Sequence, residues 1–167
     1  MPDSTCAYDV VRGGAEDGAA DKVVLTYDER FLRRKRLTTA SGLAFRVDLP
    51  ETTSLEAGDA LRLKDGRLIA VAAADEALLQ ITGPGLTRLA WHIGNRHTPC
   101  QIEEGRLLIQ SDHVLADMLA RLGARVEEVT APFTPEGGAY GHGRTMGHSH
   151  GPHEHDSHGP DHHHPHE

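Results

Sequence analysis

With 167 residues and a formal net charge of −8, the chain is long enough for two small domains and too acidic to suit nucleic acid or an anionic membrane surface. No apolar run reaches the length of about eighteen residues that a membrane-spanning helix needs. The sequence does not open on a secretory leader and contains only Cys6 and Cys100. We therefore expect a cytoplasmic protein without disulfides and without a membrane partner.

The first half of the chain predicts β-structure. Residues 1–22 are rich in glycine and lack periodicity, so we expect a flexible N-terminus there. Residues 23–74 form a β-rich N-terminal domain, in which the β-prone runs cover 23–27, 37–39, 45–48, 60–63 and 68–71. The pair Asp65-Gly66 is typical of a two-residue hairpin whose central positions both take positive φ. These patterns predict a small antiparallel β domain.

The predicted secondary structure changes near residue 75 from strands alone to strands and helices. Strands are expected over 78–81, 100–103, 106–110 and 125–129, and helices over 84–97 and from the N-cap Ser111 to Gly123. The resulting order β-α-β-β-α-β predicts a ferredoxin-like domain over residues 75–133. The fold class is therefore α+β, with two domains followed by a tail.

The tail, residues 134–167, is composed of Pro, Gly, His and acidic residues, and we expect it to be disordered. It holds ten of the 13 histidines of the chain, at His142, His148, His150, His153, His155, His158, His162, His163, His164 and His166. Neutral imidazole is a good ligand for Ni(II), Cu(II) and Zn(II), so the tail predicts metal binding without selecting the metal. An affinity tag or a solvated spacer is the alternative, but a tag would be a more uniform run of histidines.

Two further candidate ligands lie in the folded part. His97 is expected at the end of a helix, where its side chain reaches solvent, and His113 at the start of the next helix, where the helix dipole disfavours protonation. A lone histidine is a weak metal site. His97 becomes a strong one if the chain forms a two-fold dimer in which the two copies face each other, with tail histidines completing the site. A surface histidine without a ligand role explains His113 equally well. His92 is interpreted as a packed or solvated side chain, and Cys100 as a small buried one.

Several stretches together resemble the urease accessory protein UreE family, over residues 23 to 167. They are Gly94-Asn95-Arg96-His97 with Pro99, the run 112–119, Gly138-Ala139-Tyr140 with the histidine-rich end, and in the first half 25–30, 48–50 and Gly58-Asp59.

The resemblance implies a homodimeric nickel chaperone. It would bind Ni(II) and deliver it to urease through the accessory GTPase and the complex of urease apoprotein with its accessory proteins. The family's interface ligand falls on His97 and a peripheral ligand on His113, although Ser111 stands where some members have a further histidine. We place His142, His148 and His150 nearest to the interface ion, because they are closest to the folded body.

The family's N-terminal domain is thought to contact partner proteins, which offers a role for the basic run 33–36. Protection of a strand edge against aggregation explains the same run equally well.

An enzyme is not indicated, because the sequence lacks the His-Glu-x-x-His, Gly-x-Ser-x-Gly, phosphate-loop and Cys-x-x-Cys motifs. Two alternatives remain. One is a general buffer that stores Zn, Cu or Ni without a delivery target, and the other is an interaction module whose histidines are incidental.

Overall fold

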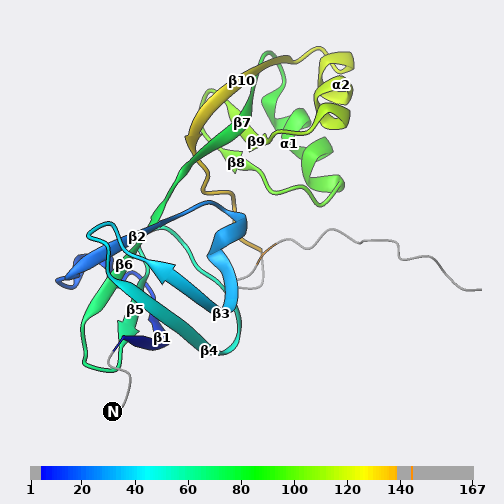
Figure 1. Cartoon of the computed structure of the whole chain (residues 1–167). Coiled ribbons are helices and arrows are strands. Elements are labelled where there is room, and N and C mark those ends of the chain that lie inside the picture. The colour runs from blue at the N-terminus through cyan, green and yellow to red at the C-terminus, as the bar shows by residue number, and fades with distance from the viewer. Residues whose placement is uncertain (1–4, 139–143, 145–167) are drawn as a thin grey trace, which may run out of the picture.

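A computed structural model describes residues 5–138 and residue 144. It is a strand-rich α+β structure with two sheets and two α-helices (Figure 1). Among the described residues, no helix is both long enough and apolar enough to cross a membrane.

The first sheet has six strands in the order β2-β6-β5-β1-β4-β3. Their bounds are β1 Cys6–Val11, β2 Asp21–Leu25, β3 Phe31–Thr38, β4 Ala44–Ser54, β5 Ala60–Leu63 and β6 Leu68–Ala73. Two short 3-10 helices, Gly14–Glu16 and Asp28–Arg30, follow β1 and β2. The expectation of a purely antiparallel domain is wrong, because β1 pairs with β4 and β2 pairs with β6 in parallel.

The expectation of a flexible N-terminus over residues 1–22 is also wrong for residues 5–22. Strand β1 lies inside the sheet, parallel to β4 on one side and antiparallel to β5 on the other. Cys6 and Ala7 at its start are fully buried. The domain therefore depends on this segment for the continuity of its sheet.

The hairpin between β5 and β6 forms at the expected place with a different turn. Gly66 has φ +89°, but Asp65 does not have positive φ, and the Asp65 carboxylate accepts a hydrogen bond from the backbone N–H of Arg67 at 3.0 Å. The core of the domain is built from aliphatic side chains and Phe45.

The second sheet begins directly after the first, since β6 ends at Ala73 and β7 starts at Asp75. It comprises β7 Asp75–Thr82, β8 Gln101–Ile102, β9 Leu107–Gln110 and β10 Arg125–Pro132, in the antiparallel order β10-β7-β9-β8. With α1 Leu86–Asn95 and α2 His113–Arg121 it follows the order β-α-β-β-α-β. This strand order and connectivity are those of the ferredoxin-like arrangement, as expected.

Both helices cover one face of this sheet, as Figure 1 shows. Leu89 and Ile93 of α1 and Leu115 and Leu119 of α2 pack against alternate residues of β7 and β9. The N-cap of α2 is Asp112, one residue after the expected Ser111, and its carboxylate accepts from the N–H groups of the next turn. Burial of these four side chains holds the two helices on the sheet.

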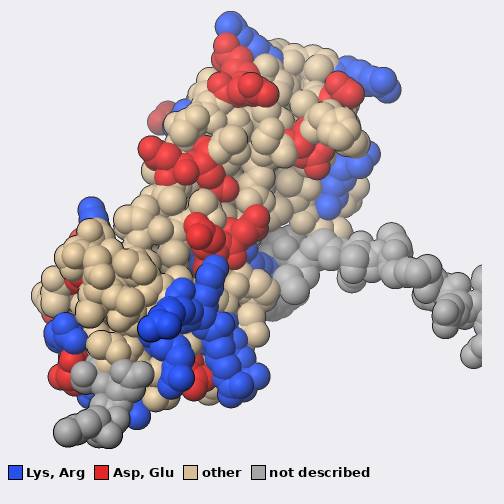
Figure 2. Space-filling view, in the orientation of Figure 1, with Lys and Arg blue, Asp and Glu red and all other residues tan. Residues whose placement is uncertain are grey.

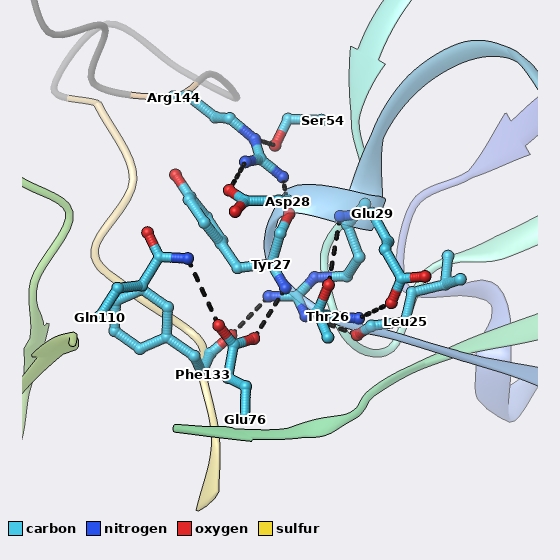
Figure 3. A network of polar contacts seen from close by, with 11 residues as sticks. Leu25, Thr26, Tyr27, Asp28, Glu29, Ser54, Glu76, Gln110, Phe133 and Arg144 are labelled. Atoms are coloured by element: carbon cyan, nitrogen blue, oxygen red, sulfur yellow. Dashed lines mark hydrogen bonds and ion pairs between the residues drawn. The ribbon is translucent and has the colours of Figure 1, made fainter. Parts of the chain in front are cut away.

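The opposite face of the second sheet meets the first domain. Phe133 is fully buried against Leu78 and Leu108, and its ring contacts Tyr27 of the first domain edge-on at 5.3 Å between centroids (Figure 3). The Glu76 carboxylate accepts from the Tyr27 backbone N–H at 2.8 Å and from the Gln110 side chain at 3.3 Å. The domains are therefore joined by an aromatic contact and by hydrogen bonds.

Arg30 is the buried cation at this junction. It is 2% exposed, and its guanidinium donates to the Leu25 carbonyl at 3.0 Å and to the Phe133 carbonyl, one in each domain. Burial lowers the pKa of Arg30, and the nearby Glu76 carboxylate opposes that shift. Its Nε has no hydrogen-bond partner within the described part of the chain.

Replacing Arg30 by Leu should lower the free energy of unfolding by about 2–5 kcal/mol, because two buried carbonyls lose their donor and the Glu76 carboxylate loses a nearby cation. The measurement is urea unfolding. Arg33→Leu is the matched control on an exposed position of β3 and should change stability by less than about 0.5 kcal/mol. An unchanged or increased stability of the Arg30 variant would show that the junction does not need its charge.

Candidate metal site after helix α1

Helix α1 ends in a hydrogen-bonded turn that carries His97. The backbone N–H of His97 donates to the Gly94 carbonyl at 2.9 Å, and that of Thr98 donates to the Ile93 carbonyl at 3.4 Å. This pair of bonds is the Schellman ending of a helix, and the residue that it places in the left-handed conformation is usually glycine.

His97 occupies that left-handed position, with φ +56°. Among the described residues it is the one non-glycine residue with positive φ. An L-residue in this conformation is strained, and such strain is concentrated at functional sites. The histidine was expected within the last turn of the helix. It lies two residues beyond the end, on a hydrogen-bonded turn, and is exposed to solvent.

The beginning of the tail runs beside the residues that follow His97. The backbone N–H of Thr134 donates to the Gln101 side-chain carbonyl, and that of Glu136 donates to the Cys100 carbonyl, each at 2.9 Å. The expectation of disorder from residue 134 onward is therefore wrong for this stretch. These bonds bring the root of the tail to within three residues of His97.

Cys100 is a poor candidate ligand in this state. Burial, with a smaller contribution from the Glu136 carboxylate, raises the pKa of the Cys100 thiol to about 11. A thiol with such a pKa is almost wholly protonated near neutral pH, whereas metal coordination uses the thiolate. The interpretation of Cys100 as a packed side chain agrees with this environment.

His113 is the first residue of α2 and is exposed. It lines a surface hollow of about 530 Å³ together with Arg96, the residue before His97. The end of α1 and the start of α2 therefore border one surface of the domain. Val114 and Trp91 are the large apolar side chains that these helices leave 55% and 64% exposed.

One chain does not assemble a metal site from its described residues, since these contain no group of three His, Cys, Asp or Glu side chains placed to hold an ion. His92 is half-buried and its ring meets that of Trp91 edge-on at 5.1 Å. The ten tail histidines, His142 to His166, lie outside the described residues.

Sequence reasoning missed two features of this site. The sequence does contain an indication of the left-handed turn at His97, because Pro99 follows the helix at the distance typical of such endings. No sequence pattern indicates the hydrogen bond between Glu136 and Cys100, because it joins backbone groups that are far apart in the sequence.

The chain is similar to known proteins over most of its length. Residues 8–74 match the family model of the N-terminal domain of UreE urease accessory protein, and residues 76–166 match that of its C-terminal domain. The urease accessory protein UreE of Ruegeria pomeroyi is 66% identical over 148 residues, which are 89% of this chain and 99% of the relative. That of Rhodobacter capsulatus is 63% identical over 143 residues, 86% of this chain and 91% of the relative. That of Paracoccus denitrificans is 57% identical over 140 residues, with coverages of 84% and 89%.

If His97 is strained, His97→Gly should raise the free energy of unfolding by about 0.5–1 kcal/mol, because glycine adopts positive φ at little steric cost. Urea unfolding of the metal-free protein measures this. Asn95→Gly, in the last turn of the same helix, is the matched control and should lower stability by about 0.1–0.4 kcal/mol, since Asn is itself a poor helix former. A loss of stability in both variants would mean that His97 is not under backbone strain.

Proposed function

The chain belongs to the urease accessory protein UreE family, whose members are accessory proteins and not enzymes, and we propose that it is a cytoplasmic carrier of Ni(II) for urease. It acts as a homodimer, binds the ion through histidines, and delivers it during assembly of the urease active site.

The observation that carries this proposal is the position of His97. His97 stands on a hydrogen-bonded turn in the left-handed conformation, exposed to solvent, and the root of the tail is hydrogen-bonded three residues away. A flexible buffer needs no such fixed ligand. A carrier does, because a defined first ligand holds one ion in a known place for transfer.

A second chain supplies what one chain lacks. A two-fold axis beside α1 brings His97 of one protomer to face the same residue of its partner, which doubles the number of fixed nitrogens. The exposed Trp91 and Val114 on the two helices are apolar surface of the kind that such a contact covers. His113, on the same surface, is the peripheral ligand.

The tail completes the coordination. The chain from His97 to Cys100 spans at most about 11 Å. The Glu136 backbone, hydrogen-bonded to Cys100, therefore lies within roughly 16 Å of the His97 backbone. His142 follows six residues later, a span of up to about 21 Å, and can reach the ion. His142, His148 and His150 are the nearest donors, and the more distant His153, His155, His158, His162, His163, His164 and His166 capture and pass on further ions.

Imidazole ligation suits Ni(II), and Cu(II) and Zn(II) are alternative cargoes. The raised pKa of Cys100 disfavours a soft thiolate site, which would select Cu(I) or a thiolate-bound Zn(II). The choice of nickel comes from the family. A general metal buffer is the competing function.

Partner docking fits the basic face of the first domain (Figure 2). Arg34, Lys35 and Arg36 on β3 and Arg46 on β4 line a hollow of about 560 Å³, which also contains the Asp48 carboxylate, and Arg33 precedes them on β3. Protection of an edge strand explains cations on β3. It does not explain Arg46, which lies on an interior strand directly opposite Arg36, where like charges repel. We assign this face to an acidic surface of the urease accessory GTPase or of the urease apoprotein complex.

A chain ending at residue 141 separates carrier from buffer. Calorimetric titration should show one tight nickel ion per two chains, and His97→Ala should weaken that binding at least about 100-fold, the cost of losing one ligand from each protomer. His92→Ala, on the preceding turn, is the control and should keep the affinity. Loss of nearly all binding on truncation, before any substitution, would favour the buffer.

Docking through the basic face is tested by Arg36→Glu. The change turns the Arg36–Arg46 pair into an attractive one, so the fold should be preserved, while affinity for the GTPase should fall about tenfold or more at low salt. Arg125→Glu on the second domain is the control. Biolayer interferometry measures the binding. If the unaltered chain, the Arg36→Glu variant and the Arg125→Glu variant bind the GTPase equally, the docking surface lies elsewhere.

A further inference from the structure

Arg144 has a buried side chain, although it lies well beyond the second domain in the sequence. Its side chain is 9% exposed, and it contacts the first domain on several sides. It is also the only Lys or Arg that follows Arg125 in the sequence.

The Arg144 guanidinium contacts aromatic rings, hydrogen-bond acceptors and a carboxylate. The group lies 3.7 Å from the ring centroid of Tyr27 and 4.9 Å from that of Phe31. Its Nε donates to the Ser54 hydroxyl at 3.0 Å, a terminal nitrogen donates to the Tyr27 carbonyl, and the Asp28 carboxylate stands 3.9 Å away (Figure 3). Two aromatic faces, two oxygen acceptors and one carboxylate match the flat, always charged fork of arginine and would suit lysine poorly.

Two members of this group have little other structural reason to be there. Phe31 is 39% exposed and does not belong to the core of the first domain. The Asp28 side chain is 81% exposed. An exposed aromatic ring beside an exposed carboxylate is explained by the cation that they share.

We propose that Tyr27, Asp28, Phe31 and Ser54 form a guanidinium-binding cage, that its ligand is Arg144, and that the cage straps the root of the tail across the two domains. The strap starts on the second domain, where the Glu136 N–H bonds Cys100, and ends eight residues later on the first. Residues from both of its ends line one hollow of about 310 Å³ with Tyr27, Arg30 and Ser54.

The strap divides the tail histidines into two groups. In the sequence, His142 comes before Arg144 and after Glu136, between the two attachment points. The other nine follow Arg144 and start from the first domain rather than from the second. This consequence for metal capture rests on the proposed function, whereas the cage itself does not.

The rate of tryptic cleavage after Arg144 tests the cage directly, because the Arg144 side chain must leave the cage to enter the active site of the protease. Cleavage there releases residues 145–167, a single fragment that mass spectrometry identifies. In metal-free protein we expect this cut to be at least tenfold slower than in a synthetic peptide of residues 136–152. Phe31→Ala and Asp28→Asn should bring the rate toward that of the peptide.

Control variants distinguish protection of Arg144 from trypsin by the cage from protection by the folded domain in general. Val24→Ala, an equally exposed apolar position on β2, should leave the rate unchanged. R144K keeps the charge and the cleavage site but loses the planar fork, so it should be cut nearly as fast as its own lysine peptide. A wild-type rate equal to that of the peptide, or a Phe31 variant no faster than the Val24 variant, would overturn the proposal. Because the assay contains no metal, a chain that protects Arg144 and yet binds no nickel would remove the proposed function and leave the cage standing.

Discussion

The left-handed backbone of His97, held in a hydrogen-bonded helix ending, is the constraint on which the proposed function depends. A glycine would satisfy the helix ending at lower energy, so the histidine is kept at a cost of the order of 1 kcal/mol. This helix ending sets the position, relative to α1, of the backbone from which the imidazole projects. A ligand on a flexible chain would lose more freedom on binding, and a fixed one loses less.

The other features of the structure place the tail and the first domain relative to His97. The ferredoxin-like sheet carries α1, the Glu136–Cys100 hydrogen bond brings the tail alongside, and the junction of Arg30, Tyr27 and Phe133 holds the first domain against the opposite face of the sheet. The helical surface is thereby left open for a second chain, while the basic face of the first domain remains open for another protein. In the proposed function, metal binding and partner docking therefore take place on different sides of the molecule.

The second domain could be predicted closely from the sequence because its elements are local and periodic: Leu89 and Ile93, for example, mark the buried face of α1. The first domain could not, because strand β1 joins the sheet by pairing with residues some forty to fifty positions away, and periodicity does not reveal partners. The histidines were found by composition. The strained turn of His97 and the burial of Arg144 required coordinates, since both are properties of packing and backbone rather than of residue type.

The claim that two copies of His97 share one ion is open to a direct measurement. Native mass spectrometry of a chain ending at residue 141, with one Ni(II) for every two chains, counts proteins and ions in the same particle. We expect particles of two chains with one nickel ion. Single chains that each carry an ion, or pairs of chains that carry none, would contradict the shared site.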